Sequence, residues 1–192
     1  MVEKLRRESK NRQSLNVWVN GLLAGSWMVY KNRPQQFQYS NAWVGSQQGR
    51  MLSLSLPFLP GNRPVEGDVV ENFFDNLLPD NSAIRRRIQK NYNTNGISPF
   101  ELLLEIGRDC VGAIQLLPQG VEPTGWDTIQ ARPLTDSEVE MHLHAAMSTA
   151  LPSEAQGEFR ISIAGAQEKT ALLWHNEQWC APVGVTPTTH IM

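Results

Sequence analysis

The spacing of apolar residues changes along the chain, and this change constrains the possible fold more than any other feature. Leu15, Val17 and Val19 are separated by single residues, which is the two-residue period of a half-buried strand. Asn20-Gly21 follows, and because both residues accept a positive φ, the pair predicts a tight turn and a return strand over residues 22–30. After residue 68 the apolar spacing becomes three and four residues, the period of an amphipathic helix. The chain therefore combines sheet and helix, and we expect an α+β fold.

Further strands and helices are expected between residues 37 and 117. A short strand should include Phe37 and Tyr39, and the alternation over residues 51–57 predicts a half-buried strand that ends at its proline. Three helices are expected. The first covers residues 69–78, the second follows a cap at residue 80, 81 or 82, and the third follows a capping box formed by Ser98 and Glu101. The inward-facing residues of the last two helices are expected to be Ile84, Ile88, Phe100, Leu103 and Leu104. A strand over residues 111–117 should follow.

A stretch rich in proline and glycine, residues 118–133, divides the chain. We interpret it as a linker between an N-terminal subdomain of strands and helices, residues 14–117, and a C-terminal part, residues 134–192. The C-terminal part should begin with a helix opened by a Thr135–Glu138 capping box and continue into short strands, including 159–164, 170–174 and 178–180. Trp174 and Trp179 should pack across the last hairpin. Residues 1–12 carry five cationic and two anionic side chains, so we interpret residues 1–13 as a basic flexible arm. A solvated tail is the simplest interpretation, and an arm that contacts nucleic acid or an acidic partner is the alternative.

The composition excludes several classes of protein. The chain has 192 residues, 41% of them hydrophobic, and a formal net charge of -2, which is typical of a globular protein with its own core. The sequence contains no run of about 18 apolar residues, so it predicts no transmembrane helix. Its charged start lacks the apolar stretch of a secretory signal. Cys110 and Cys180 are isolated, so we expect packed, reduced thiols in a cytoplasmic protein. The four histidines have no carboxylate or cysteine at ligand spacing, and we expect no metal site.

One loop carries a weak signal for phosphate binding. Ala164, Gly165 and Ala166 lie between two apolar runs that predict strands. Small residues let backbone N–H groups approach an anion, and successive N–H groups can form a nest for phosphate oxygens. Lys169 would add a positive charge. An ordinary hairpin loop remains the alternative at this point, because the segment has neither a Walker nor a G-x-G-x-x-G pattern.

Several motifs then occur together in one order. They are SLSLP at 53–57, FFDNLLPD at 73–80, EIGRD at 105–109 with VGA at 111–113, FRISIAGAQEKTALL at 159–173 and TPTTHI at 186–191. Taken together they resemble HipA-type serine/threonine protein kinases, the toxins of bacterial toxin–antitoxin pairs, over about residues 15–192. The resemblance implies an N-terminal subdomain followed by the first helix and strands of a kinase-like N-lobe. It also implies a family that phosphorylates aminoacyl-tRNA synthetases and arrests growth, which leads to persistence.

The resemblance assigns roles to the loop. In HipA-type kinases the residues that match Ala164, Gly165, Ala166, Gln167, Glu168 and Lys169 contact the phosphates of ATP, which reacts as its Mg²⁺ complex. Ser162 matches the autophosphorylation site, and its modification is thought to eject the loop and switch the kinase off. This is physically reasonable because a phosphoserine adds about −1.5 to −2 charges beside the nucleotide phosphates.

The sequence also departs from the family. HipA-type kinases continue, after the segment that matches residues 188–191, into a lysine that binds nucleotide phosphates. A C-terminal catalytic lobe then supplies an Asp general base and metal-binding Asn and Asp. This sequence ends at Met192, so we expect no catalytic residue in it and no phosphoryl transfer by this chain alone. The alternative is a non-catalytic module that holds an antitoxin or a separate kinase subunit.

Basic residues cluster on the predicted helix that carries Ile84 and Ile88. They are Arg85, Arg86, Arg87 and Lys90. A solvated charged face is the simplest interpretation. The resemblance implies an alternative, which is contact with a HipB-like antitoxin, with the operator DNA that the antitoxin complex binds, or with a second toxin copy. The carboxylates of Asp75, Asp80 and Asp109 are expected to be caps or members of ion pairs.

Overall fold

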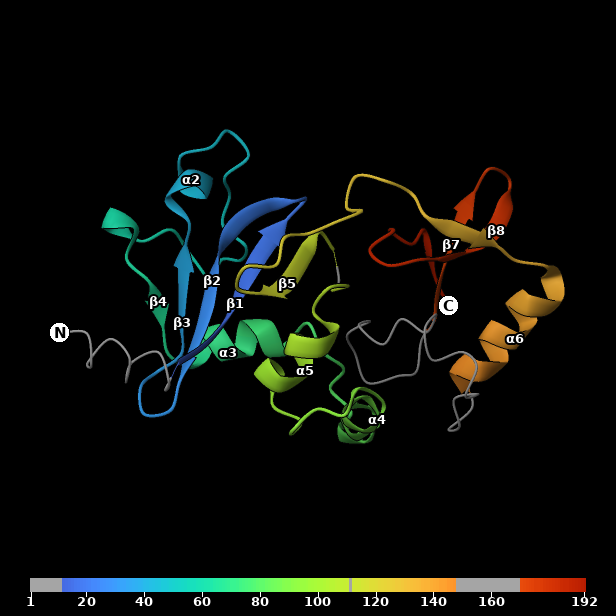
Figure 1. Cartoon of the computed structure of the whole chain (residues 1–192), viewed down its shortest axis with the longest axis horizontal. Coiled ribbons are helices and arrows are strands. Elements are labelled where there is room, and N and C mark those ends of the chain that lie inside the picture. The colour runs from blue at the N-terminus through green and yellow to red at the C-terminus, as the bar shows by residue number, and fades with distance from the viewer. Residues whose placement is uncertain (1–11, 111, 148–169) are drawn as a thin grey trace.

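The computed structural model describes residues 12–110, 112–147 and 170–192. It confirms the α+β fold and contains two antiparallel sheets (Figure 1). The first sheet has the order β4-β3-β2-β1-β5. Its strands are β1 (Arg12–Val19), β2 (Leu22–Tyr30), β3 (Gln36–Tyr39), β4 (Val65–Glu66) and β5 (Ile114–Pro118). We call residues 12–118, which contain this sheet, the first body.

β1 and β2 form the hairpin that the sequence predicted. Asn20 and Gly21 have φ values of 47° and 75°, the left-handed conformation that this turn requires. The register shifts by one residue between Val17 and Trp18. Leu15 and Val17 are fully buried and Val19 nearly so. One face of β1 therefore lies in the core of the first body.

The described helices of the first body are α2 (Asn41–Val44), the 3-10 helix η1 (Pro60–Asn62), α3 (Asp68–Asp75), α4 (Ser82–Tyr92) and α5 (Pro99–Ile106). Two of them, α4 and α5, begin at caps that the sequence indicated. The Asn81 side chain caps α4, and Ser98 and Glu101 form a capping box at the start of α5. Such caps satisfy backbone N–H groups that have no partner within a helix. Figure 1 shows α3 and α5 beside each other below the strands.

Trp27 of β2 is the centre of the core between sheet and helices. Its ring stacks on Phe74 of α3 with centroids 4.1 Å apart and meets Phe100 of α5 edge-on at 5.1 Å. Trp27 and Phe74 are both fully buried. The indole N–H of Trp27 donates a hydrogen bond to Gln35 Oε1 at 2.8 Å, so the burial leaves no unsatisfied donor there.

The prediction of a strand over residues 51–57 is wrong. The Tyr39 hydroxyl accepts a hydrogen bond from the Leu52 N–H at 2.8 Å and donates one to the Leu56 carbonyl at 2.6 Å. These bonds hold a tight turn in which Leu56 is buried while Leu54 is 90% exposed. The alternating apolar residues of 51–57 therefore belong to a turn that Tyr39 holds. The only strand-like pairing described within this segment is the single bridge between Ser53 and Leu56.

Helix α5 differs from the prediction at one position. Phe100 and Leu103 are buried as expected, but Leu104 is 39% exposed and Leu102 is fully buried. Residues 102–104 are consecutive leucines, so apolar spacing did not distinguish them. Packing determines which of the three leucines are buried, because α5 contacts α3, α4 and β5 at once. In α4, Ile84 and Ile88 are buried as predicted.

We call residues 131–147 and 170–192 the second body. It contains α6 (Asp136–Met147) and a sheet of order β6-β8-β7-β9, with β6 (Ala131–Pro133), β7 (Ala171–His175), β8 (Gln178–Pro182) and β9 (His190–Ile191). Thr135 and Glu138 form the predicted capping box, with Thr135 N donating to Glu138 at 2.8 Å. β6 occupies the end of the predicted linker, residues 118–133, so that stretch is not loop throughout. The strand predicted at 159–164 lies outside the described residues, and none of the described helices is long and apolar enough to span a bilayer.

Replacing the central aromatic of α3 tests the core. Phe74→Ala should lower the free energy of unfolding by about 3–5 kcal/mol, because it removes a buried ring and leaves a cavity beside Trp27. Leu54→Ala is the matched control, and its effect should stay within about 0.5 kcal/mol because this leucine is exposed in the turn. Urea unfolding followed by circular dichroism measures both. A large loss in Leu54→Ala would instead support the strand that the sequence predicted over residues 51–57.

Candidate functional site

The predicted phosphate loop, residues 164–169, and Ser162 lie outside the described residues. The structure does describe the point at which this loop joins the second sheet. Thr170 is 4% exposed, its N–H donates to the Met192 carbonyl at 3.0 Å, and its carbonyl accepts from the Met192 N–H at 2.9 Å. Thr170, which follows the predicted loop in the sequence, is therefore attached to the edge of the sheet beside β9.

The motif at residues 186–191 uses its threonines to hold the second sheet. The Thr186 hydroxyl accepts a hydrogen bond from the Gln130 N–H at 2.9 Å. The Thr189 hydroxyl accepts one from the Trp174 N–H at 2.7 Å and lies 2.8 Å from His190 Nδ1. These side chains therefore bind backbone groups in places where the short strands provide no ladder partner.

An aromatic cluster covers one face of the second sheet. Trp174 and Trp179 meet edge-on across the β7–β8 hairpin at 5.0 Å, which confirms the predicted packing. His190 of β9 lies 4.9 Å from the Trp179 ring. Trp174 is 44% exposed, so the cluster forms part of the surface of the protein.

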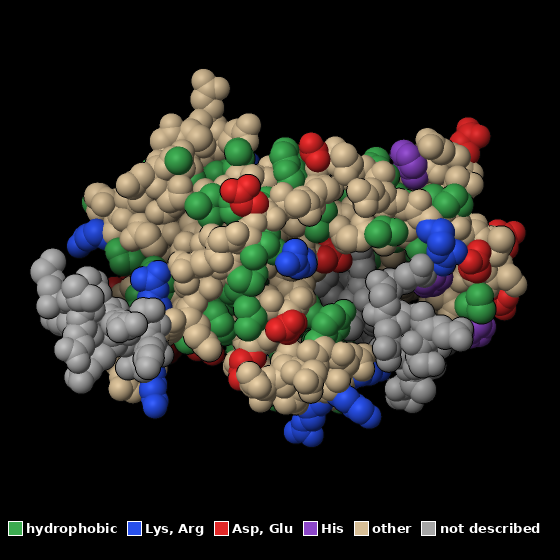
Figure 2. Space-filling view, in the orientation of Figure 1, with side chains coloured by type: hydrophobic (Ala, Val, Ile, Leu, Met, Phe, Trp, Pro, Cys, Tyr) green, Lys and Arg blue, Asp and Glu red, His purple; other side chains and the backbone are tan. Residues whose placement is uncertain are grey.

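The structure separates the four basic residues of α4. Arg85 is directed back to α3, where Nη1 donates to the Asp75 carboxylate and Nε to the Pro79 carbonyl, both at 2.6 Å. The expectation that Arg85 shares an open charged face with the other three is therefore corrected, and the predicted ion pair of Asp75 is confirmed. Arg86 and Lys90 are exposed and Arg87 is half-buried. Figure 2 shows basic side chains projecting at the lower edge of the molecule, where α4 lies in Figure 1.

Both cysteines are buried free thiols, as the sequence predicted. The Cys110 thiol donates to the Gly107 carbonyl at 3.4 Å. Burial, and then the negative charge of Asp109, raise the pKa of the Cys110 thiol far above its usual value, so it is a poor nucleophile. Among the described residues, no group of three or more His, Cys, Asp or Glu side chains could hold a metal ion.

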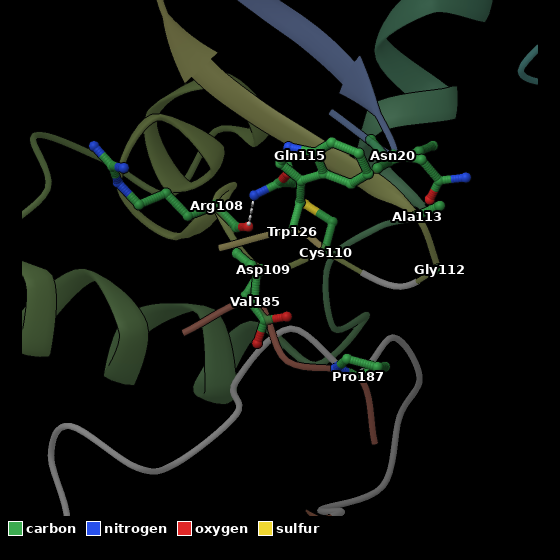
Figure 3. Close-up of a pocket in the computed structure, with 11 residues that line it drawn as sticks. Asn20, Arg108, Asp109, Cys110, Gly112, Ala113, Gln115, Trp126, Val185 and Pro187 are labelled. Atoms are coloured by element: carbon green, nitrogen blue, oxygen red, sulfur yellow. Dashed lines mark hydrogen bonds between the residues drawn. The ribbon is translucent and has the colours of Figure 1, made fainter. Parts of the chain in front are cut away.

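A cavity of about 240 Å³ lies where the two bodies meet (Figure 3). Its wall combines Asn20 of the β1–β2 turn, residues 108–115 in part, Trp126, Val185 and Pro187. Gln115 is 7% exposed and its amide donates to the Arg108 carbonyl at 3.2 Å. Sequence reasoning did not find this cavity, because its wall comes from several segments that lie far apart in the sequence, from Asn20 to Pro187.

The first body is matched by a known family model. The model describes the HipA N-terminal domain, and it matches residues 15–117, which is more than half of the chain. The chain belongs to the HipA N-terminal domain family. The resemblance that the motifs indicated is thereby confirmed for the N-terminal portion of a HipA-type protein.

Two relatives extend the similarity to HipA-type proteins beyond the first body. Y4mE of Sinorhizobium fredii, which is named as a candidate kinase, is 33% identical over 184 residues, and the match covers 93% of this chain and 42% of that protein. The serine/threonine-protein kinase toxin HipA of Shewanella oneidensis is 30% identical over 155 residues, covering 80% of this chain and 33% of that protein. The chain therefore spans less than half the length of either relative.

Neutralising single arginines of α4 tests their different environments. Arg85→Ala should lower the free energy of unfolding by about 1–2 kcal/mol, because it leaves Asp75 and the Pro79 carbonyl without their partner. Arg86→Ala should change it by less than about 0.5 kcal/mol, since that side chain is exposed. Chemical unfolding of the two variants side by side gives the comparison, and equal losses would contradict the ion pair as a stabilising contact.

Proposed function

We propose that this chain is the nucleotide-loop half of a HipA-type serine/threonine protein kinase. The observation that carries the proposal is the family membership of residues 15–117, together with similarity to the Shewanella kinase toxin that continues over 80% of the chain. The intact kinase would act in the cytoplasm on an aminoacyl-tRNA synthetase and arrest growth. Its partners would be a HipB-like antitoxin, the operator DNA bound by that antitoxin, and the C-terminal kinase lobe.

In this proposal residues 164–169 hold the phosphates of ATP. Backbone N–H groups beside small residues and the Lys169 ammonium supply positive charge. ATP supplies the phosphoryl group and arrives with Mg²⁺, which we assign to no residue of the described part of the chain. The attachment of Thr170 to Met192 supports the proposal because the residue that directly follows the loop in the sequence is held beside the sheet. Phosphorylation of Ser162 would place negative charge beside the nucleotide and weaken its binding.

We further propose that the 192-residue polypeptide binds ATP without transferring its phosphate. Phosphoryl transfer needs a positioned base and metal ligands in addition to a phosphate loop. In HipA-type kinases these groups follow the segment that matches residues 188–191. The two matches cover 42% and 33% of the relatives, so more than half of each relative has no counterpart in these 192 residues.

A nucleotide-binding and autophosphorylation assay tests this proposal. The purified chain with Mg²⁺ and ATP should bind nucleotide and acquire no phosphate on Ser162, as read by intact mass. Lys169→Ala should weaken ATP binding about tenfold or more, the cost of one charge-assisted contact. Lys90→Ala is the matched control and should leave binding unchanged. Phosphate on Ser162 without an added kinase would contradict the proposed inactivity, and equal binding by Lys169→Ala would contradict the assigned loop.

A second candidate function is a non-catalytic module that holds an antitoxin complex. The observation that favours it is the exposure of Arg86 and Lys90, which lie four residues apart and therefore on one face of α4. Arg85 is occupied by Asp75 and contributes to the orientation of the helix. Two free cations on one helical face suit an acidic protein surface or DNA phosphates.

Charge neutralisation on α4 tests this second function. Arg86→Gln combined with Lys90→Gln should weaken binding to a HipB-like antitoxin on operator DNA at low salt. If both cations contact phosphates, the slope of log K against log salt should fall by about 0.9 for each. Lys31→Gln, at an exposed cation in the β2–β3 connection, is the matched control. Binding that is unchanged in the double variant would count against α4 as the contact.

A further inference from the structure

The segment between the two bodies contains a turn that presents one aromatic ring. The Thr128 N–H and hydroxyl both lie 3.4 Å from the Gly125 carbonyl, which closes a turn over residues 125–128. Gly125 has a φ of 71°, a conformation that favours glycine. Trp126 is the next residue of this turn, and its side chain is 47% exposed. The ring is therefore held on the surface by local backbone geometry.

Trp126 contacts the first body at Gly21. The backbone of Gly21 approaches the indole so closely that a Cβ added there would clash with the ring atoms Cε2, Nε1 and Cδ2 of Trp126. Gly21 also has a φ of 75° in the β1–β2 turn. Glycine is thus needed at this position for two reasons, the turn and the indole that covers it.

The same segment is attached to the second body four residues later. The Gln130 N–H donates to the Thr186 hydroxyl at 2.9 Å, and the Gln130 carbonyl accepts from the Val183 N–H at 2.8 Å. Thr186 is 1% exposed, so this attachment is well enclosed. The chain then enters β6, which pairs with β8. Residues 126–130 therefore connect a contact on the first sheet to a strand of the second.

The cavity of about 240 Å³ lies beside this contact. Figure 3 shows Trp126 close to Asn20, with Pro187 on the far side of the space. Trp126 is not part of the buried core of the first body. Within the described ranges, the pairs of helices and strands that contact each other extensively all lie inside one body. The indole can therefore leave Gly21 without opening either body.

We propose that Trp126 is a releasable latch between the two bodies. Against Gly21, the indole holds the second body in the orientation seen in the structure. When the indole leaves, the second body turns about the residues that follow β5, and the cavity at the junction opens. The latch thereby sets how the exposed basic face of α4 lies relative to the second sheet. This inference rests on neither nucleotide binding nor antitoxin binding.

Fluorine NMR of the full chain labelled with 5-fluorotryptophan tests the contact. The sequence holds six tryptophans, and Trp126→Phe assigns the Trp126 signal. Gly21→Ala should shift that signal towards the position of a solvent-exposed indole. Gly61→Ala is the matched control, because Gly61 has a φ of 67° but open space where its Cβ would lie, so the backbone strain is similar and no ring is displaced. The signals of buried Trp27 and Trp43 report whether each variant stays folded.

Small-angle X-ray scattering of the same proteins tests the release. The radius of gyration should rise in Gly21→Ala and in Trp126→Ala and stay unchanged in Gly61→Ala. Trp126→Ala puts no strain on the β1–β2 turn, so it keeps the test valid if Gly21→Ala does not fold. A Trp126 signal that does not move in a folded Gly21→Ala variant would overturn the contact. A radius of gyration that is unchanged in Trp126→Ala would overturn the latch.

Discussion

The stacking of Trp27 on Phe74 is the contact on which the first body depends. It joins the middle of the sheet to α3, and the edge-on contact of Trp27 with Phe100 joins α5 to the same point. A buried aromatic contributes more apolar area than any aliphatic side chain, so one residue of β2 positions two helices. Its indole N–H is bonded to Gln35, which makes this burial possible without an unsatisfied donor.

The position of α3 then determines which charges reach the surface. Asp75 ends α3 and binds Arg85 of α4, so the direction of α4 follows from that of α3. Ile84 and Ile88 turn inward on the same helix. Arg86 and Lys90 remain exposed to solvent, because Ile84 and Ile88 face the core and Arg85 faces Asp75. The exposed basic face is thus a consequence of how the core packs, because the stacking of Trp27 on Phe74 positions α3 and α3 in turn orients α4.

Local rules predicted much of the fold, and contacts between distant residues account for the errors. The turn at Asn20-Gly21 and the box at Ser98 depend on neighbouring residues, so the sequence alone was sufficient for them. The strand expected over residues 51–57 was wrong because the competing partner is the Tyr39 hydroxyl. Arg85 was assigned to an open face because its partner lies ten residues back, on another helix. The contact of Trp126 with Gly21, and the cavity beside it, could not be predicted. Both depend on how the two bodies are placed in space, and the spacing of apolar residues carries no information about that placement.

Different kinds of contact stabilise the two bodies. The first has a continuous apolar core between a five-stranded sheet and its helices. The second has strands of two to five residues, which offer few ladder hydrogen bonds. Its motif at residues 186–191 compensates, because the hydroxyls of Thr186 and Thr189 bind backbone N–H groups from the linker and from β7. These two threonines therefore have a structural role in the second body, and replacing either of them should first destabilise the sheet.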